Sequence, residues 1–184
     1  SMIQRTPPLL SGVVRRWRRA SVDARTRLYA DFATRFARDG LHGPARPCDP
    51  LELDRAEIAL ETYLPASYRQ FLCTHGPVFV PDLWDIVVEQ KLGAHPVREF
   101  LAPGQVVNDT RLYWTGGMPK DLVGVAGDFI GNLFGFHRIA RNGSRPDDLP
   151  VTLFDHDYGR IDPAAPSFDT WLGWYLEHVG AAIS

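Results

Sequence analysis

The chain has 184 residues, of which 45% are hydrophobic, and its formal net charge is −2. A chain of this length buries about 70% of its unfolded surface, so it can fold without a disulfide or a structural metal. Cys48 and Cys73 lack the CxxC spacing of a zinc site, and no apolar run approaches the roughly 18 residues of a membrane-spanning helix. We therefore expect a cytoplasmic protein with reduced thiols, no metal, no cofactor and no membrane contact.

The small net charge conceals an uneven distribution. Residues 1–46 hold ten Arg and three Asp, a net charge of +7, whereas residues 47–184 hold ten Lys and Arg against nineteen Asp and Glu, a net charge of −9. Such an asymmetry is typical either of an interaction arm on an acidic body or of two regions that attract each other and fold together. We accordingly expect a basic helical N-terminal extension, 1–46, packed on or flanking an acidic domain, 47–184.

The extension begins with a basic run, Arg15-Arg16-Trp17-Arg18-Arg19, that could contact nucleic acid or anionic lipid, although such a run is more often a solvated helix face. A helix is predicted over 21–38, with Ser21 as N-cap and Gly40 just past its end. Its apolar residues recur at helical spacing and predict a packing surface made of Val22, Tyr29, Phe32, Ala33 and Phe36.

A loop over 41–47 leads to two further helices. Asp49 and Pro50 predict an N-cap and a first helical residue. Pro65 ends this helix and starts the next, which stops at Gly76. The apolar face of the pair consists of Leu53, Ala56, Leu60, Tyr63, Leu64, Tyr68, Phe71 and Leu72.

The segment 77–88 is apolar and aromatic, and we interpret it as one or two strands, 78–80 and 83–88, with Pro81 at a bend. Residues 93–104 are rich in Pro and Gly and predict irregular structure or a short helix. A helix is expected over 106–114.

Three short strands are predicted in succession, Leu122–Ala126, Leu133–Phe136 and Val151–Phe154, each rich in β-branched or aromatic residues and bounded by Gly, Asn, Asp or Pro. The polar loop 141–148 is long enough to contact a partner. Ser167 caps a final helix whose apolar stripe runs from Phe168 to Val179.

Four of these elements carry sequence motifs in a recognisable order. The run Val125-Ala-Gly-Asp-Phe-Ile-Gly-Asn-Leu-Phe-Gly-Phe136 resembles the G-D-x-x-G-N signature of the SUKH superfamily, and Pro150-Val151…Asp155-His156-Asp157 resembles its next strand. Upstream, Leu64-Pro65-x-x-Tyr68-x-x-Phe71-Leu72-x-x-x-Gly76 resembles its opening element, and downstream Ser167-Phe168-x-x-Trp171-Leu172 resembles its closing one. The resemblance implies an α+β fold with a twisted, mainly antiparallel central sheet packed by helices.

The best enzymatic candidate is Asp155-His156-Asp157, joined by His137 and Asp128, because His and carboxylates bind divalent metals or act as acid and base. Successive strand residues point to opposite faces, however, so the three side chains do not converge from a regular strand. We favour the interpretation that the aspartates satisfy turn backbone groups while His156 packs or forms hydrogen bonds. No nucleophile motif, P-loop or dinucleotide loop is present, and we predict no catalytic residue.

A binding role explains the sequence better than an enzymatic role does. Acidic residues follow the central strands, and three aromatic residues lie close to polar or turn residues, a combination suited to a basic protein partner. The contact residues predicted on this basis are Trp84, Asp85, Trp114, Asp147, Asp148, Asp155, Asp157 and Tyr158.

The resemblance implies an immunity protein that binds and occludes a cognate secreted toxin domain, such as a nuclease or another nucleic-acid-directed effector, without contacting nucleic acid itself. The arginine-rich extension lies outside the resemblance and would suit an acidic toxin instead. Two alternatives are a non-catalytic regulatory scaffold, because the family includes eukaryotic cell-wall regulators, and a metal-assisted hydrolase that uses His156.

Overall fold

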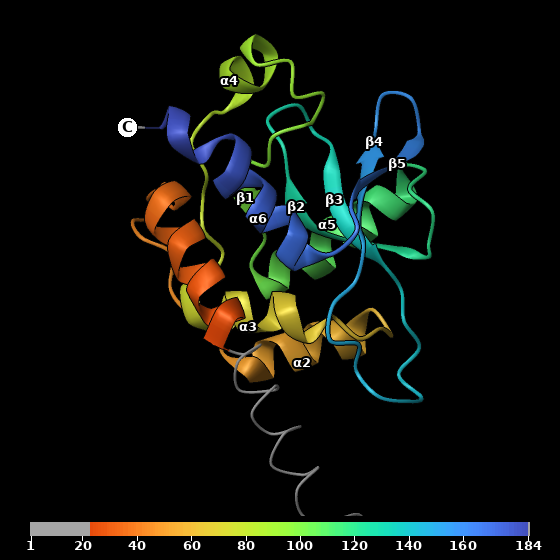
Figure 1. Ribbon diagram of the computed structural model, residues 1–184. Helices are drawn as coiled ribbons and strands as arrows, with labels where there is room; N and C mark the ends of the chain where they lie inside the picture. Colours follow the sequence, from red (N-terminus) through yellow and green to blue (C-terminus); the bar gives the residue numbers. More distant parts are fainter. Residues whose placement is uncertain (1–22, 184) are drawn as a thin grey trace, which may run out of the picture.

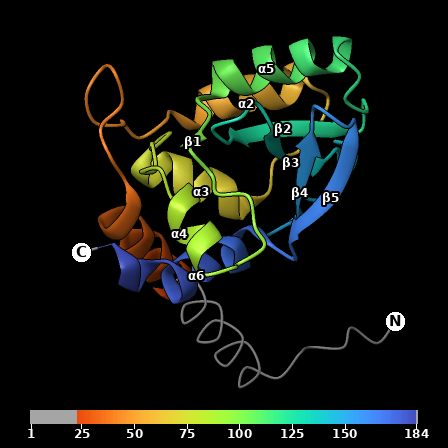
Figure 2. The same ribbon diagram turned by 90° about the horizontal axis from the view of Figure 1, so that it is seen from above.

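Five strands form one antiparallel sheet in which each strand pairs with its neighbour in sequence. The computed structural model describes residues 23–183 (Figures 1 and 2). The strands are β1 (Glu99–Phe100), β2 (Leu122–Gly127), β3 (Leu133–His137), β4 (Val151–Asp155) and β5 (Arg160–Ala165). The predicted α+β class and the three central strands are therefore confirmed.

Two glycines allow the β2–β3 hairpin to form. Gly131 in the turn has a φ of +91°, a conformation that residues with a Cβ rarely adopt. A Cβ on Gly135 would lie 2.1 Å from the carbonyl oxygen of Val123 on the neighbouring strand. Any other residue at position 135 would push the two strands apart.

Six helices are described after residue 49, together with a helix over 23–36 that we call the N-terminal helix. They are α2 (Pro50–Ala59), α3 (Ala66–His75), α4 (Trp84–Glu89), α5 (Pro103–Thr115), α6 (Phe168–His178) and the short 3₁₀ helix η1 (Gly180–Ala182). The predicted caps are confirmed, because the Asp49 side chain accepts from Leu51 N and the Ser167 side chain accepts from Thr170 N.

Helices cover both faces of the sheet, with α5 on one side and α6 on the other (Figure 2). The strand alternation explains this arrangement, since Phe154 packs against Tyr113 of α5, whereas Phe134 packs against Trp171 of α6. All residues of β2 and β4 are consequently buried.

The N-terminal helix contributes to the same core. Phe32 contacts three rings from other elements, Phe71, Phe100 and Tyr175, at centroid distances of 5.9 to 6.0 Å. Tyr29 and Phe36 are buried beside it, as their helical spacing predicts. Ser21, Val22 and the basic run 15–19 lie outside the described residues.

The prediction of a strand over 83–88 is wrong. This segment forms α4, and its burial follows the helical spacing, because Leu83 and Val87 are buried while Trp84 and Val88 are exposed. The carboxylate of Asp82 accepts a hydrogen bond from Trp84 N and holds the start of the helix. Residues 78–80 are extended but make only isolated bridges, from Phe79 to Arg38 and to Glu99.

Two strands, β1 and β5, were not predicted from the sequence pattern. The segment 93–104, expected to be irregular or a short helix, contains the two-residue strand β1 and the first turn of α5. Strand β5 has a proline, Pro163, in its second half and alternates weakly, features that lower the expectation of a strand. Because β5 pairs only with β4, it tolerates a residue without a backbone N–H.

Candidate protein-binding site

Helix α4 and the β2–β3 and β4–β5 turns lie at one end of the molecule, at the top of Figure 1. Among residues 23–183, five of the nine exposed large hydrophobic residues are found there. We call this region the apolar-acidic end and define it by Trp84, Asp85 and Val88 of α4, Phe129 and Ile130 of the β2–β3 turn, and Asp157 and Tyr158 of the β4–β5 turn.

Residues that follow α4 contact both this helix and the β2–β3 turn. The rings of Trp84 and His95 lie 6.1 Å apart, and His95 Nδ1 lies 3.8 Å from Asp128 Oδ2. The Arg98 guanidinium stacks over the Phe129 ring at 5.1 Å and supports this exposed ring from one side.

The two turns are joined by hydrogen bonds around Asn132. Asp128 Oδ1 accepts from Ile130 N and Asn132 N, at 2.9 and 2.8 Å. Asn132 Oδ1 accepts from His156 N at 3.2 Å and lies 2.9 Å from His156 Nδ1. These hydrogen bonds hold the backbones of the two turns in a fixed relation to each other.

A cleft of about 500 Å³ opens below these turns, between the 92–95 segment, β5 and α6. Its floor is apolar and includes Phe134, Leu153, Trp171 and Tyr175. A shallower hollow of about 350 Å³ beside α4 shares Gly93, Ala94 and His95 with it. Trp84 and Val88 line the shallower hollow, so this part of the apolar-acidic end could receive side chains from a partner.

Carboxylates outnumber cations around this end. The exposed acids are Asp82, Asp85, Glu89 and Asp157, and the exposed cations are Lys91, Arg98 and Arg160. Arg160 Nε is bound to Asp162 Oδ2 at 2.8 Å, so its charge is compensated locally. The surface would attract a positively charged partner.

Four of the predicted contact residues, Trp84, Asp85, Asp157 and Tyr158, belong to this end, and Tyr158 is 80% exposed. Sequence reasoning missed Val88, Phe129 and Ile130. The sequence did indicate that Phe129 and Ile130 are exposed, because both lie between Gly127 and Gly131 in a turn too short for their side chains to reach the core.

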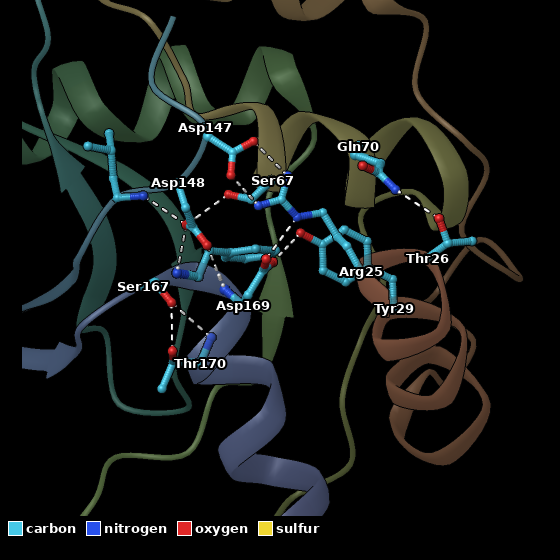
Figure 3. Close-up of polar contacts among 12 residues, drawn as sticks. Arg25, Thr26, Tyr29, Ser67, Gln70, Asp147, Asp148, Ser167, Asp169 and Thr170 are labelled. Atoms are coloured by element: carbon cyan, nitrogen blue, oxygen red, sulfur yellow. Dashed lines mark hydrogen bonds and ion pairs between the residues drawn. The ribbon is translucent and has the colours of Figure 1, made fainter. Parts of the chain in front are cut away.

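Asp147 belongs to a different cluster, which we call the helix junction and define by Arg25, Tyr29, Asp147, Asp148 and Asp169 (Figure 3). Both oxygens of Asp147 accept from the Arg25 guanidinium, at 2.9 and 2.7 Å. Arg25 also donates to Asp169 at 2.8 Å, and the Tyr29 hydroxyl donates to the same carboxylate. The junction ties the N-terminal helix to α6, and the hydrogen bond from Arg25 lowers the pKa of Asp147.

Asp148 caps the start of α6. Its carboxylate accepts from Phe168 N and Asp169 N, at 2.9 and 3.1 Å, and from the Ser67 hydroxyl at 2.9 Å (Figure 3). Leu149 N donates a fourth hydrogen bond at 2.8 Å. An acid at a helix N-terminus satisfies unpaired N–H groups and complements the helix dipole.

Two further predicted contact residues also have intramolecular partners. Trp114 is half-buried, and its Nε1 donates to Leu122 O at 2.9 Å. Asp155 is buried and accepts from Asp157 N and Tyr158 N at 3.1 and 3.2 Å, which confirms its predicted role in the turn.

The enzymatic candidates do not converge. His156 faces Asn132 and Asp157, whereas His137 lies 3.3 Å from Asp121. Among residues 23–183 no group of three or more His, Cys, Asp or Glu side chains could hold a metal ion.

Burial raises the pKa of the Cys48 thiol to about 11 and also raises that of Cys73, so both thiols are protonated at neutral pH. Within the part of the chain that the structure describes, every helix is too short or too polar to cross a membrane.

A scan against protein-family models matches residues 47–174 to the SMI1 / KNR4 family (SUKH-1). The chain belongs to this family. No curated protein matches the chain. The SUKH-1 match covers α2 to α5, the whole sheet and most of α6, and it leaves the N-terminal helix outside.

The structure explains the motifs that this SUKH-1 chain carries. In the G-D-x-x-G-N motif, Asp128 and Asn132 close the β2–β3 turn, and Asn132 Nδ2 donates to Asp128 Oδ2 at 2.9 Å. In the closing motif, Ser167 caps α6 while Phe168 and Trp171 are buried. These motif residues stabilise the fold, and the exposed residues that surround them are free to determine a partner.

Proposed function

We propose that this SUKH-1 protein is a cytoplasmic immunity protein that binds a cognate secreted toxin domain and neutralises it by occlusion, without catalysis of its own. Membership of the SUKH family supports the immunity role. The observation that carries the proposal is that Trp84, Val88, Phe129, Ile130 and Tyr158 are all exposed on α4 and the two turns at the same end of the molecule, where Trp84 and Val88 line a hollow.

Apolar surface in contact with water is energetically unfavourable. Clustered aromatic and aliphatic side chains in contact with water mark binding surfaces, and buried Trp and Tyr residues commonly dominate binding energy. Trp84 and Tyr158 would supply these contacts, while Asp85 and Asp157 would increase the association rate with a basic surface. Toxins that act on nucleic acid commonly present such a surface.

The direct test is co-expression with the protein encoded immediately upstream, scored by growth rescue and by co-purification of a stable complex. We expect both. A Trp84→Ala/Tyr158→Ala double variant should weaken the complex by at least 100-fold while its far-UV circular dichroism spectrum stays unchanged.

The matched control replaces two exposed leucines on other surfaces. Leu41→Ala/Leu51→Ala should change the affinity less than threefold, because Leu41 and Leu51 lie outside the apolar-acidic end. Absence of both rescue and complex, with both proteins folded, would contradict the proposed function for that pair. Full affinity in the Trp84/Tyr158 variant would place the contact surface elsewhere.

A further inference from the structure

A second charged surface lies around the C-terminal end of α2, away from α4 and the turns of the apolar-acidic end (Figure 1). Although residues 47–184 carry a net charge of −9, five of their ten cationic side chains gather there. We call this surface the basic patch and define it by Arg111, Lys120, Arg138, Arg141 and Arg145.

The last carbonyls of α2 and the turn after it hold three of these arginines together. Arg111 Nη2 donates to Ala59 O at 3.1 Å, and Arg138 Nη2 donates to Leu60 O at 2.8 Å. Arg145 Nη1 donates to Leu64 O at 2.9 Å. Carbonyls at a helix C-terminus have no intrahelical partner and attract cations, so this part of the chain brings the positive charges together.

Aromatic rings orient the guanidinium groups. Arg141 and Arg145 both stack on the Tyr63 ring, at 5.5 and 4.9 Å from its centroid. Arg138 stacks on the Trp114 ring at 5.3 Å. Stacking holds a planar guanidinium in a fixed orientation, which lowers the entropic cost of binding a carboxylate. All three guanidinium nitrogens of Arg138 already donate to backbone carbonyls, so a carboxylate would bind at Arg141 rather than at Arg138.

Carboxylates compensate two of the five cations of the patch, Arg138 and Arg145. Glu61 lies 3.6 Å from Arg138, and Asp121 pairs with His137 rather than with Lys120. Glu57 is buried and binds both Arg69 and Arg145. Within residues 23–183, no carboxylate lies within 4.0 Å of the cationic groups of three exposed patch residues, Arg111, Lys120 and Arg141.

We propose that the basic patch binds a short carboxylate-rich segment of a protein partner. Oriented arginines bind carboxylates through paired N–H donors. The acidic surroundings favour a short protein segment over a nucleic acid, because the phosphates of a longer polyanion would extend beyond the patch and be repelled. This inference does not depend on the immunity role, since it concerns a separate surface and a partner of opposite charge.

The experiment measures fluorescence anisotropy of a labelled decaglutamate peptide with the full chain at low ionic strength. We expect saturable binding that Lys120→Glu/Arg141→Glu weakens at least tenfold. The control Arg27→Glu/Lys91→Glu produces the same change in net charge at exposed positions outside the patch and should change the affinity less than twofold.

Circular dichroism checks that each variant is folded, and Lys120→Gln/Arg141→Gln replaces the charge-reversal variant if that variant unfolds. Three results would overturn the proposal. They are no binding by the wild-type chain, an equal loss of affinity in the control, and tighter binding of a ten-nucleotide oligothymidylate than of decaglutamate. The last result would assign the patch to nucleic acid.

Discussion

The helix junction and the apolar-acidic end both combine aspartates with aromatic rings, yet they use them in opposite ways. At the junction, Asp148 accepts four hydrogen bonds and Tyr29 is buried, whereas Asp157 and Tyr158 at the other region are exposed. The difference follows from the groups that face each aspartate in the folded chain. Asp147 faces Arg25 and Asp148 faces the N-terminus of α6 (Figure 3). The turn that carries Asp157 and Tyr158 is exposed to solvent. Residue type alone therefore does not distinguish a structural aspartate from a candidate contact.

The largest expected effect separates buried from exposed rings. Phe32→Ala should lower the free energy of unfolding by about 3–5 kcal/mol, because Phe32 is fully buried among Phe71, Phe100 and Tyr175. Trp84→Ala should lower it by at most about 1 kcal/mol, since the Trp84 side chain is 40% exposed. Urea unfolding, monitored by circular dichroism, measures the free energy of unfolding of both variants. Similar decreases in the two variants would contradict the distinction between the buried and the exposed ring.

A smaller effect separates the two kinds of aspartate. Asp148→Ala should cost about 1–3 kcal/mol, because it leaves the first N–H groups of α6 and the Ser67 hydroxyl without their acceptor. Asp157→Ala, which removes an exposed carboxylate, should change the free energy of unfolding by less than about 0.5 kcal/mol. Equal urea midpoints for the two variants would show that Asp148 does not stabilise α6.

The smallest effect is a pH dependence at the junction. Arg25 lowers the pKa of Asp147 below its ordinary value of 3.8. A carboxyl whose pKa is depressed on folding stabilises the folded state above its unfolded pKa, and this contribution is lost as the pH falls through the folded pKa. Asp147→Asn should therefore be slightly less stable than the wild type at pH 6, and the gap should close toward pH 3.

The size of this gap is limited because the Asp147 side chain is 78% exposed and therefore solvated. A gap between Asp147→Asn and the wild type that stays constant from pH 6 to pH 3 would argue against the Arg25 pair as its source.

Local rules account for the parts of the fold that were predicted correctly. Asp49 and Ser167 cap helices because their side chains reach the N–H groups of the following turn. Gly131 permits the β2–β3 turn because of its positive φ. The segment 83–88 was misassigned because a short apolar run suits both a strand and a half-buried helix. Strand β5 was missed because an edge strand needs neither strict alternation nor every backbone donor.

By itself, the sequence determined the α+β class, the central meander, the starts of α2, α3 and α6 and membership of the SUKH family, because these depend on residues close together in the chain. The predicted end of α2 at Pro65 was wrong, since this helix ends at Ala59. Only the tertiary structure showed that Asp147 and Asp148 have intramolecular partners, whereas Trp84, Asp85, Asp157 and Tyr158 are exposed. It also added Phe129 and Ile130 to the apolar-acidic end. Hydrogen bonds at the junction join residues more than one hundred positions apart. The spacing of residues along the chain does not reveal such distant partners, so only the fold decides which side chains are exposed and which are paired.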